Sequence, residues 1–116
     1  MYFQSLQVWQ KAFDLTSTIH ILLKSFPIEE RYALTEQMRR SSLSIVSNIA
    51  EWNGRSWNSE YSYFLSIAKG SCSELAAQIL LAERFGYISP EYSQKNLEII
   101  EEIIRMLHGM IKKFRE

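Results

Sequence analysis

Two histidines and one cysteine are the side chains of this 116-residue chain best suited to metal binding or nucleophilic catalysis. A di-metal site in a helical bundle uses glutamate three residues before histidine on two helices. Ser17 stands three residues before His20, and Arg105 stands three residues before His108. The motif is therefore absent, and the sequence predicts no metal site and no other cofactor.

Cys72 would act as a nucleophile only if a neighbouring base lowered the pKa of its thiol. No base stands near it in the sequence, and it lies at the edge of an apolar helical stripe, where a buried cysteine behaves as a small hydrophobic residue. Glu98 and Glu102 share a helix face, but surface charge explains their spacing better than a metal site does. The four glycines are scattered, so no phosphate-binding glycine loop is present. The sequence thus predicts a protein that is not an enzyme.

Length and charge limit the remaining classes. A chain of 116 residues suits a single domain, residues 1–116, with a core of its own. Its 13 basic and 13 acidic residues cancel, which argues against a strongly basic nucleic-acid binder but allows a local basic patch. One cysteine, no signal peptide and no apolar run near the roughly 18 residues of a membrane span indicate a cytoplasmic protein without a membrane partner.

Four segments carry apolar residues at steps of three and four, the spacing of an amphipathic helix. Proline or glycine follows the first three segments, at Pro27, Asn53-Gly54 and Gly86. The predicted helices cover residues 6–26, 35–52, 59–85 and 90–114. Because short connections join them, the expected fold is all-α, an antiparallel up-and-down four-helix bundle.

Polar residues mark the starts of the later helices. Thr35 and Ser59 are the expected N-caps of the second and third helices. Ser89, followed by a proline and a glutamate, is the strongest start signal in the chain. Tyr32 and Leu34, in the connection before the second helix, are expected to insert into the core.

The second helix organises the fold, because apolar residues occupy more than half of its circumference. Its serines are small enough to let neighbouring helices approach closely. This apolar surface exceeds what the core of one chain can cover, and Trp9, Trp52 and Trp57 add surface that suits an interface. The sequence therefore predicts a closed homo-oligomer.

A narrow polar strip remains on the second helix, with Arg40 and Glu51 about 16 Å apart along its axis. That distance is too long for a direct ion pair, so each side chain needs another partner. Glu74, on the flank of the third helix, is one candidate. Two hypotheses stay open: a structural polar network of Arg40, Glu51 and Glu74 within the bundle, or contacts of these residues across subunits.

Basic residues near the helix ends are candidates for contacts with nucleic-acid phosphates, with ordinary surface charge as the competing interpretation. The candidates are Arg39, Arg55, Lys69, Lys112, Lys113 and Arg115. Antiparallel packing is expected to bring Arg55 near the cluster that closes the chain. In an oligomer such a cluster recurs once per subunit, so a neutral chain can still present a positive ring.

Several stretches, spread over almost the whole chain, resemble one protein family. They are Leu6 to Ala12, Phe26-Pro27, Glu30 to Tyr32, Gln37 to Arg40, Ser44-Ile45, Ser47 to Glu51, Phe64 to Ser71 and Glu74-Leu75. In this order they resemble the four-helix bundle proteins encoded in intervening sequences of bacterial 23S ribosomal RNA genes. Position 52 departs from the pattern, because Trp52 replaces the glycine usual after Ala-Glu, so Gly54 is expected to end the second helix instead.

The resemblance implies an antiparallel four-helix bundle that assembles into a ring-like homopentamer, with no enzymatic activity. The chain is also similar, distantly, to the accessory variability protein of diversity-generating retroelements, a basic pentameric barrel that binds reverse transcriptase and nucleic acid. Two functions follow as hypotheses. One is a homo-oligomeric scaffold or adaptor for a protein partner. The other is an RNA- or DNA-binding accessory factor that acts through basic residues repeated around the oligomer, together with a nucleic-acid-processing protein.

Overall fold

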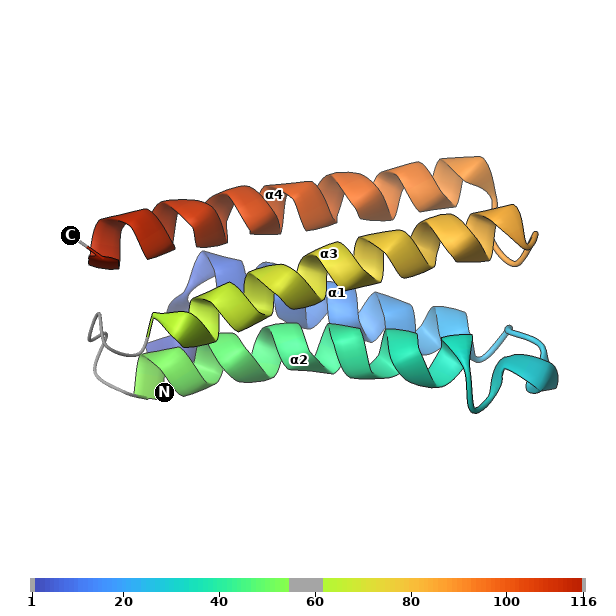
Figure 1. Ribbon diagram of the computed structural model, residues 1–116, viewed down its shortest axis with the longest axis horizontal. Coiled ribbons are helices and arrows are strands. Elements are labelled where there is room, and N and C mark those ends of the chain that lie inside the picture. The colour runs from blue at the N-terminus through green and yellow to red at the C-terminus, as the bar shows by residue number, and fades with distance from the viewer. Residues whose placement is uncertain (1, 55–61, 116) are drawn as a thin grey trace.

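The computed structural model describes residues 2–54 and 62–115 (Figure 1). Its four long helices are α1 (Gln7–Leu23), α2 (Leu34–Gly54), α3 (Tyr63–Arg84) and α4 (Pro90–Arg115). Two short 3-10 helices, η1 (Tyr2–Ser5) and η2 (Ile28–Glu30), precede α1 and α2. The two described ranges contain no strand, so the predicted all-α class is confirmed.

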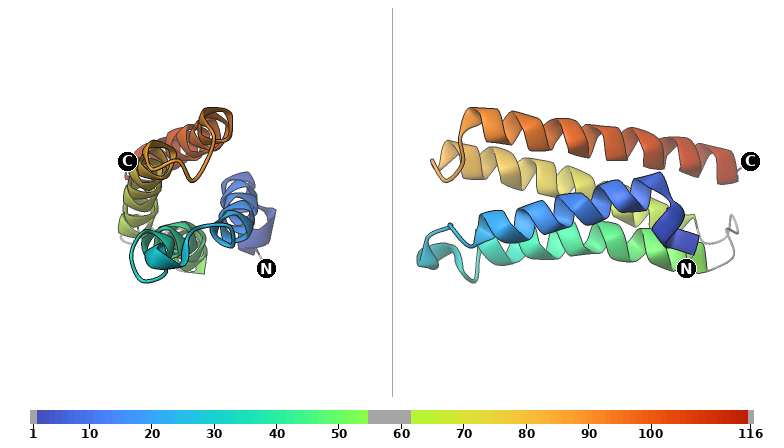
Figure 2. Two further views of the ribbon diagram at one scale, coloured as in Figure 1. Left: turned by 90° about the vertical axis from the view of Figure 1, so that its right-hand side faces the viewer. Right: turned by 180° about the vertical axis from the view of Figure 1, so that it is seen from behind.

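Consecutive helices run antiparallel along a body of 43 × 22 × 21 Å. In the end-on view of Figure 2, α1 lies diagonally across from α3, and α2 lies diagonally across from α4. The start of α1, the end of α2, the start of α3 and the end of α4 therefore share one end of the bundle (Figure 1). This is the up-and-down arrangement that short connections predict.

The core is the shared interior of the four amphipathic helices. α1 buries Val8, Ala12, Leu15, Ile19 and Leu23, which recur at steps of three and four. Each large aliphatic side chain removed from water stabilises the fold by about 1.5–3 kcal/mol. The other helices bury the same kind of stripe, which includes Met38, Ile45, Ile49, Leu65, Leu75, Ile79, Ile100, Ile103 and Leu107.

The helix starts agree only in part with the sequence. Ser89 caps α4 as predicted, because its hydroxyl accepts the Tyr92 backbone N–H at 3.1 Å. Thr35 is not an N-cap: α2 already begins at Leu34, and the Thr35 side chain is buried inside the helix. α3 begins at Tyr63, and the expected cap at Ser59 lies outside the described residues.

In the connections between helices, one predicted helix end is confirmed and two predictions are wrong. Gly86 follows α3 with φ +83°, the left-handed conformation that glycine adopts without strain, so the predicted helix end is confirmed. α1 ends at Leu23 rather than Phe26, although the Phe26 ring is still buried and packs 5.2 Å from the Tyr87 ring. Tyr32 is 85% exposed, so its predicted insertion into the core is wrong, whereas Leu34 is buried as expected.

Trp52 belongs to the core, not to an exposed interface. α2 continues through Gly54, and Trp52 stands two turns after Ile45 on the buried face of that helix. Its side chain is 1% exposed, and its ring meets the Phe114 ring edge-on at 5.3 Å. The interface role predicted for Trp52 is therefore wrong, while Trp57 lies outside the described residues.

None of the helices in residues 2–54 and 62–115 combines the length and apolar character needed to span a membrane.

Candidate functional site

Cys72 sits in the core of α3, shielded from solvent. Burial raises the pKa of its thiol from 9.0 to about 12, because the apolar surroundings disfavour the thiolate. A thiol in this state is a structural side chain, which agrees with the small hydrophobic residue that the sequence predicts. Across the described part of the chain, no three histidine, cysteine, aspartate or glutamate side chains gather where they could hold a metal ion.

The raised pKa of Cys72 predicts slow alkylation. At pH 8 iodoacetamide should react with the folded protein about a thousandfold more slowly than with the urea-unfolded chain. Iodoacetamide reacts with the thiolate, and a thiol pKa of about 12 rather than 9.0 makes the thiolate about a thousandfold rarer in the folded protein. The folded state should also lose stability between pH 9 and 12, where only the unfolded chain releases the proton. Mass spectrometry of timed reactions measures the rates, and equal rates would mean that the thiol is accessible.

Hydroxyl groups, not ion pairs, join α2 to α3. The Ser41 hydroxyl lies 2.6 Å from Glu74 Oε1, and the Ser71 hydroxyl donates to Ser44 Oγ at 2.8 Å. Arg40, Glu51 and Glu74 are all exposed, and no ion pair joins Arg40 to either carboxylate within the described residues. Within one chain the three therefore do not form the buried network that the sequence predicts, because the polar strip of α2 faces solvent.

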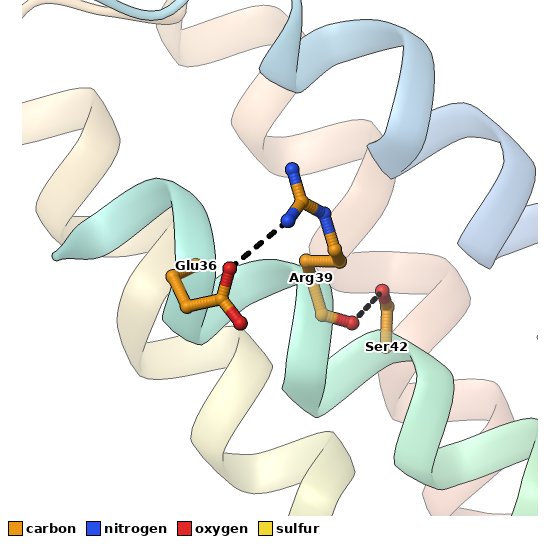
Figure 3. A network of polar contacts seen from close by, with 3 residues as sticks. All are labelled: Glu36, Arg39 and Ser42. Atoms are coloured by element: carbon orange, nitrogen blue, oxygen red, sulfur yellow. Dashed lines mark hydrogen bonds and ion pairs between the residues drawn. The ribbon is translucent and has the colours of Figure 1, made fainter. Parts of the chain in front are cut away.

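Arg39 lies near the start of α2, away from the end of the bundle where α4 ends (Figure 1). It occupies the second turn of α2, about 22 Å along the axis from the end of that helix. Its guanidinium forms an ion pair with Glu36 at 2.9 Å, and its carbonyl accepts the Ser42 hydroxyl at 3.0 Å (Figure 3). Arg39 is therefore not part of the basic cluster that closes the chain.

Lys69 lies instead at a groove of about 390 Å³ between α3 and α4. Its ammonium is 3.2 Å from His108 Nδ1, across 39 residues of sequence. Ser66, Ser73 and Ile111 also line the groove, so its walls combine hydroxyl groups with apolar surface.

Two further cations extend this groove along α4. Arg105 and Lys112 stand three residues before and four residues after His108, which places all three on one helix face. Both are exposed, and neither makes an ion pair within the described residues, although Glu101 stands one turn before Arg105. We call Lys69, Arg105, His108 and Lys112 the basic face.

Two acidic residues of α4 have other contacts. Glu102 forms an ion pair with Lys11 of α1 at 3.2 Å, and Glu98 accepts the Gln94 side-chain amide at 3.2 Å. Glu102 therefore faces α1, whereas the basic face borders α3. Glu101 and Glu98 stand one and two turns before Arg105, so carboxylates border the basic face at its Arg105 end.

The remaining basic candidates fall outside this face. Lys113 lines a different cavity, between α1 and α4, although it is adjacent to Lys112 in the chain. Arg55 lies outside the described residues, and for Arg115 only its place at the end of α4 is described. Sequence reasoning missed Arg105, for which the spacing to His108 and Lys112 was an available signal.

A second surface feature runs along the outer side of α3. Tyr63, Ile67, Leu81 and Phe85 are each between 44% and 53% exposed and follow the steps of one helix face. We call these four residues the apolar stripe. Glu74 lies midway along it, but the Ser41 hydroxyl holds its carboxylate toward α2.

Comparison with known proteins relates the chain to a sequence family and to solved structures. The sequence model described as 23S rRNA-intervening sequence protein matches residues 4–109. A solved structure from Bacteroides thetaiotaomicron, a protein with unknown function from the S23 ribosomal protein family, is 26% identical and superposes with a TM-score of 0.82. The similarity covers 90% of this chain and 98% of that one. No curated protein sequence is similar enough to count as a match.

Proposed function

Because the chain belongs to the family of 23S rRNA-intervening sequence proteins, we propose that it is a non-enzymatic scaffold built from several copies of itself. The observation that carries this proposal is the apolar stripe of α3. Large apolar side chains scattered singly are ordinary on a surface, whereas the apolar stripe places a pair of them at each end of one face of α3, which suits an interaction site.

The spacing of the stripe suits a helix from another copy. Ile67, Glu74 and Leu81 are seven residues apart, as are Tyr63, Gly70 and Ala77, which is the residue spacing of paired helices, with Glu74 and Gly70 in place of large apolar residues at the middle. Gly70 leaves open space, since a Cβ placed there meets no atom within 4 Å. A partner helix can therefore approach closely at the middle of the stripe and pack against large side chains at both ends.

The mass in solution tests this proposal. Light scattering at tens of micromolar should give a multiple of the 13.6-kDa chain, and about 68 kDa for the pentameric ring that the family resemblance implies. A monomer at that concentration would contradict it.

The basic face favours a second candidate function, the binding of RNA or DNA. Lys69, Arg105 and Lys112 project from neighbouring helices, and none of the three forms an ion pair within the described residues. Cations without an ion-pair partner are available to phosphate oxygens, and such contacts do not depend on base sequence. A ring would repeat the face once per subunit, which would strengthen binding to a long polyanion.

Adjacent lysines provide a matched test of this binding. Lys112→Glu should weaken RNA binding at least tenfold in a gel shift, because it reverses a charge on the basic face, whereas Lys113→Glu should change it less than about twofold. With three cations engaged, wild-type affinity for a single strand should fall roughly twentyfold between 50 and 200 mM salt. Both variants carry the same net charge, so equal weakening would point to overall charge, and no shift at 50 mM salt would exclude the binding.

A further inference from the structure

A cavity of about 400 Å³ opens at the end of the bundle where α1 begins and α4 ends. Its walls are mostly apolar: Trp52 and Phe114 form an aromatic side, and Met106 and Met110 line the side of α4. This volume falls in the range of small-molecule sites, which are about 300–1,000 Å³. Neither the scaffold role nor nucleic-acid binding uses this cavity, since it borders α1 rather than the basic face or the apolar stripe.

We propose that this cavity binds a small amphiphile with an apolar body and one anionic group, of the type of a medium-chain carboxylate. The walls suit the apolar body, and methionine side chains adapt to ligands of varied shape. Lys113 is the one charged residue among the described residues that line the cavity, and it is exposed to solvent at the rim. An ammonium in that place complements a carboxylate on the solvent side of the ligand.

The surroundings of Lys113 favour a ligand with an anionic group over a ligand with a neutral polar group. Within the described residues its ammonium has no carboxylate partner, and it lies 5.5 Å from the centre of the Phe114 ring. α1 starts beside the same cavity, and its first turn contains no acidic residue. No negative side chain among the described lining residues therefore competes with the ligand for Lys113.

Gly109 allows the cavity to be filled without disturbing the core. It lines the cavity from α4, and a Cβ built there meets no atom within 4 Å. Gly109→Leu should therefore fold and should place its side chain in the space of the ligand. Gln94→Leu, near the opposite end of α4, adds an exposed leucine of the same size away from the cavity and serves as the control.

The test uses 1-anilinonaphthalene-8-sulfonate, an apolar aromatic anion whose fluorescence rises on binding. Wild type and Gln94→Leu should bind it saturably, and octanoate should displace it at lower concentration than 1-octanol does. Gly109→Leu should weaken binding at least tenfold. Lys113→Met should weaken the binding of octanoate about threefold to tenfold and leave the binding of 1-octanol unchanged, because only the contact between the ammonium and the carboxylate is lost.

Three results would overturn the proposal. Saturable binding that is equal in Gly109→Leu and wild type would place the probe elsewhere. If octanoate and 1-octanol displaced the probe at equal concentrations, the ligand would not need an anionic group. No saturable binding to the wild type, together with a lower mass of Gly109→Leu in light scattering, would show that a second copy of the chain fills the cavity instead.

Discussion

Glutamate at both Ile67 and Leu81 should convert the assembly into monomers. The two side chains are 44% and 46% exposed in the single chain, so the substitutions should leave the fold intact. In an assembly that covers the apolar stripe, each glutamate would be buried without a partner at a cost of several kcal/mol. Since about 1.4 kcal/mol changes an affinity tenfold, association should weaken a hundredfold or more. Light scattering and sedimentation of the double variant measure this loss.

Ile21 provides the matched control for this double variant. It is an aliphatic residue that is 67% exposed on α1, which lies diagonally across the bundle from α3 (Figure 2). Ile21→Glu should keep the wild-type mass, and circular dichroism should show the same helix content for all three proteins. If the double variant also keeps the wild-type mass, the apolar stripe is not the interface between copies. The stripe would then no longer support the proposed scaffold.

Trp52→Gly, which restores the residue typical of the family pattern, should destabilise this protein rather than improve it. Removing a buried tryptophan side chain costs about 3–5 kcal/mol, and glycine in place of alanine inside a helix costs about 1 kcal/mol more. The total of about 4–6 kcal/mol is a large share of the 5–15 kcal/mol that holds an ordinary domain together. Urea denaturation, followed by circular dichroism at one protein concentration, measures the loss.

Two further variants separate the causes of that loss. Trp52→Ala should retain most of the effect, because the empty space beside Phe114 is the larger contribution. Trp9→Ala should cost less, since Trp9 is only half-buried and meets the Phe3 ring tilted and the Phe13 ring edge-on near the surface. A Trp52→Gly protein as stable as the wild type would mean that the glycine restores a better helix end, as the family pattern suggests.

The sequence by itself determined which segments are helical and which of their faces are buried. Helix formation depends on residues within four positions of each other, so the apolar steps of α1 and the cap at Ser89 were visible in the sequence. The positive φ of Gly86 was predictable for the same reason, because a helix end is a local event. The ends of α1 and α2 differ from the predicted ones by one to three residues, as at Phe26 and Leu34, and both of these side chains are buried by tertiary packing.

Only the tertiary structure decided which polar groups meet. Lys69 and His108 are 39 residues apart and come together because α3 and α4 pack side by side. No local sequence pattern predicts such a contact. In the same way packing buried Trp52 against Phe114, left Tyr32 in solvent and turned the strip of Arg40 outward. A helical wheel gives the angle of each side chain about its own helix. Which neighbour, cavity or solvent lies at that angle depends on how all four helices pack, and therefore on the whole fold.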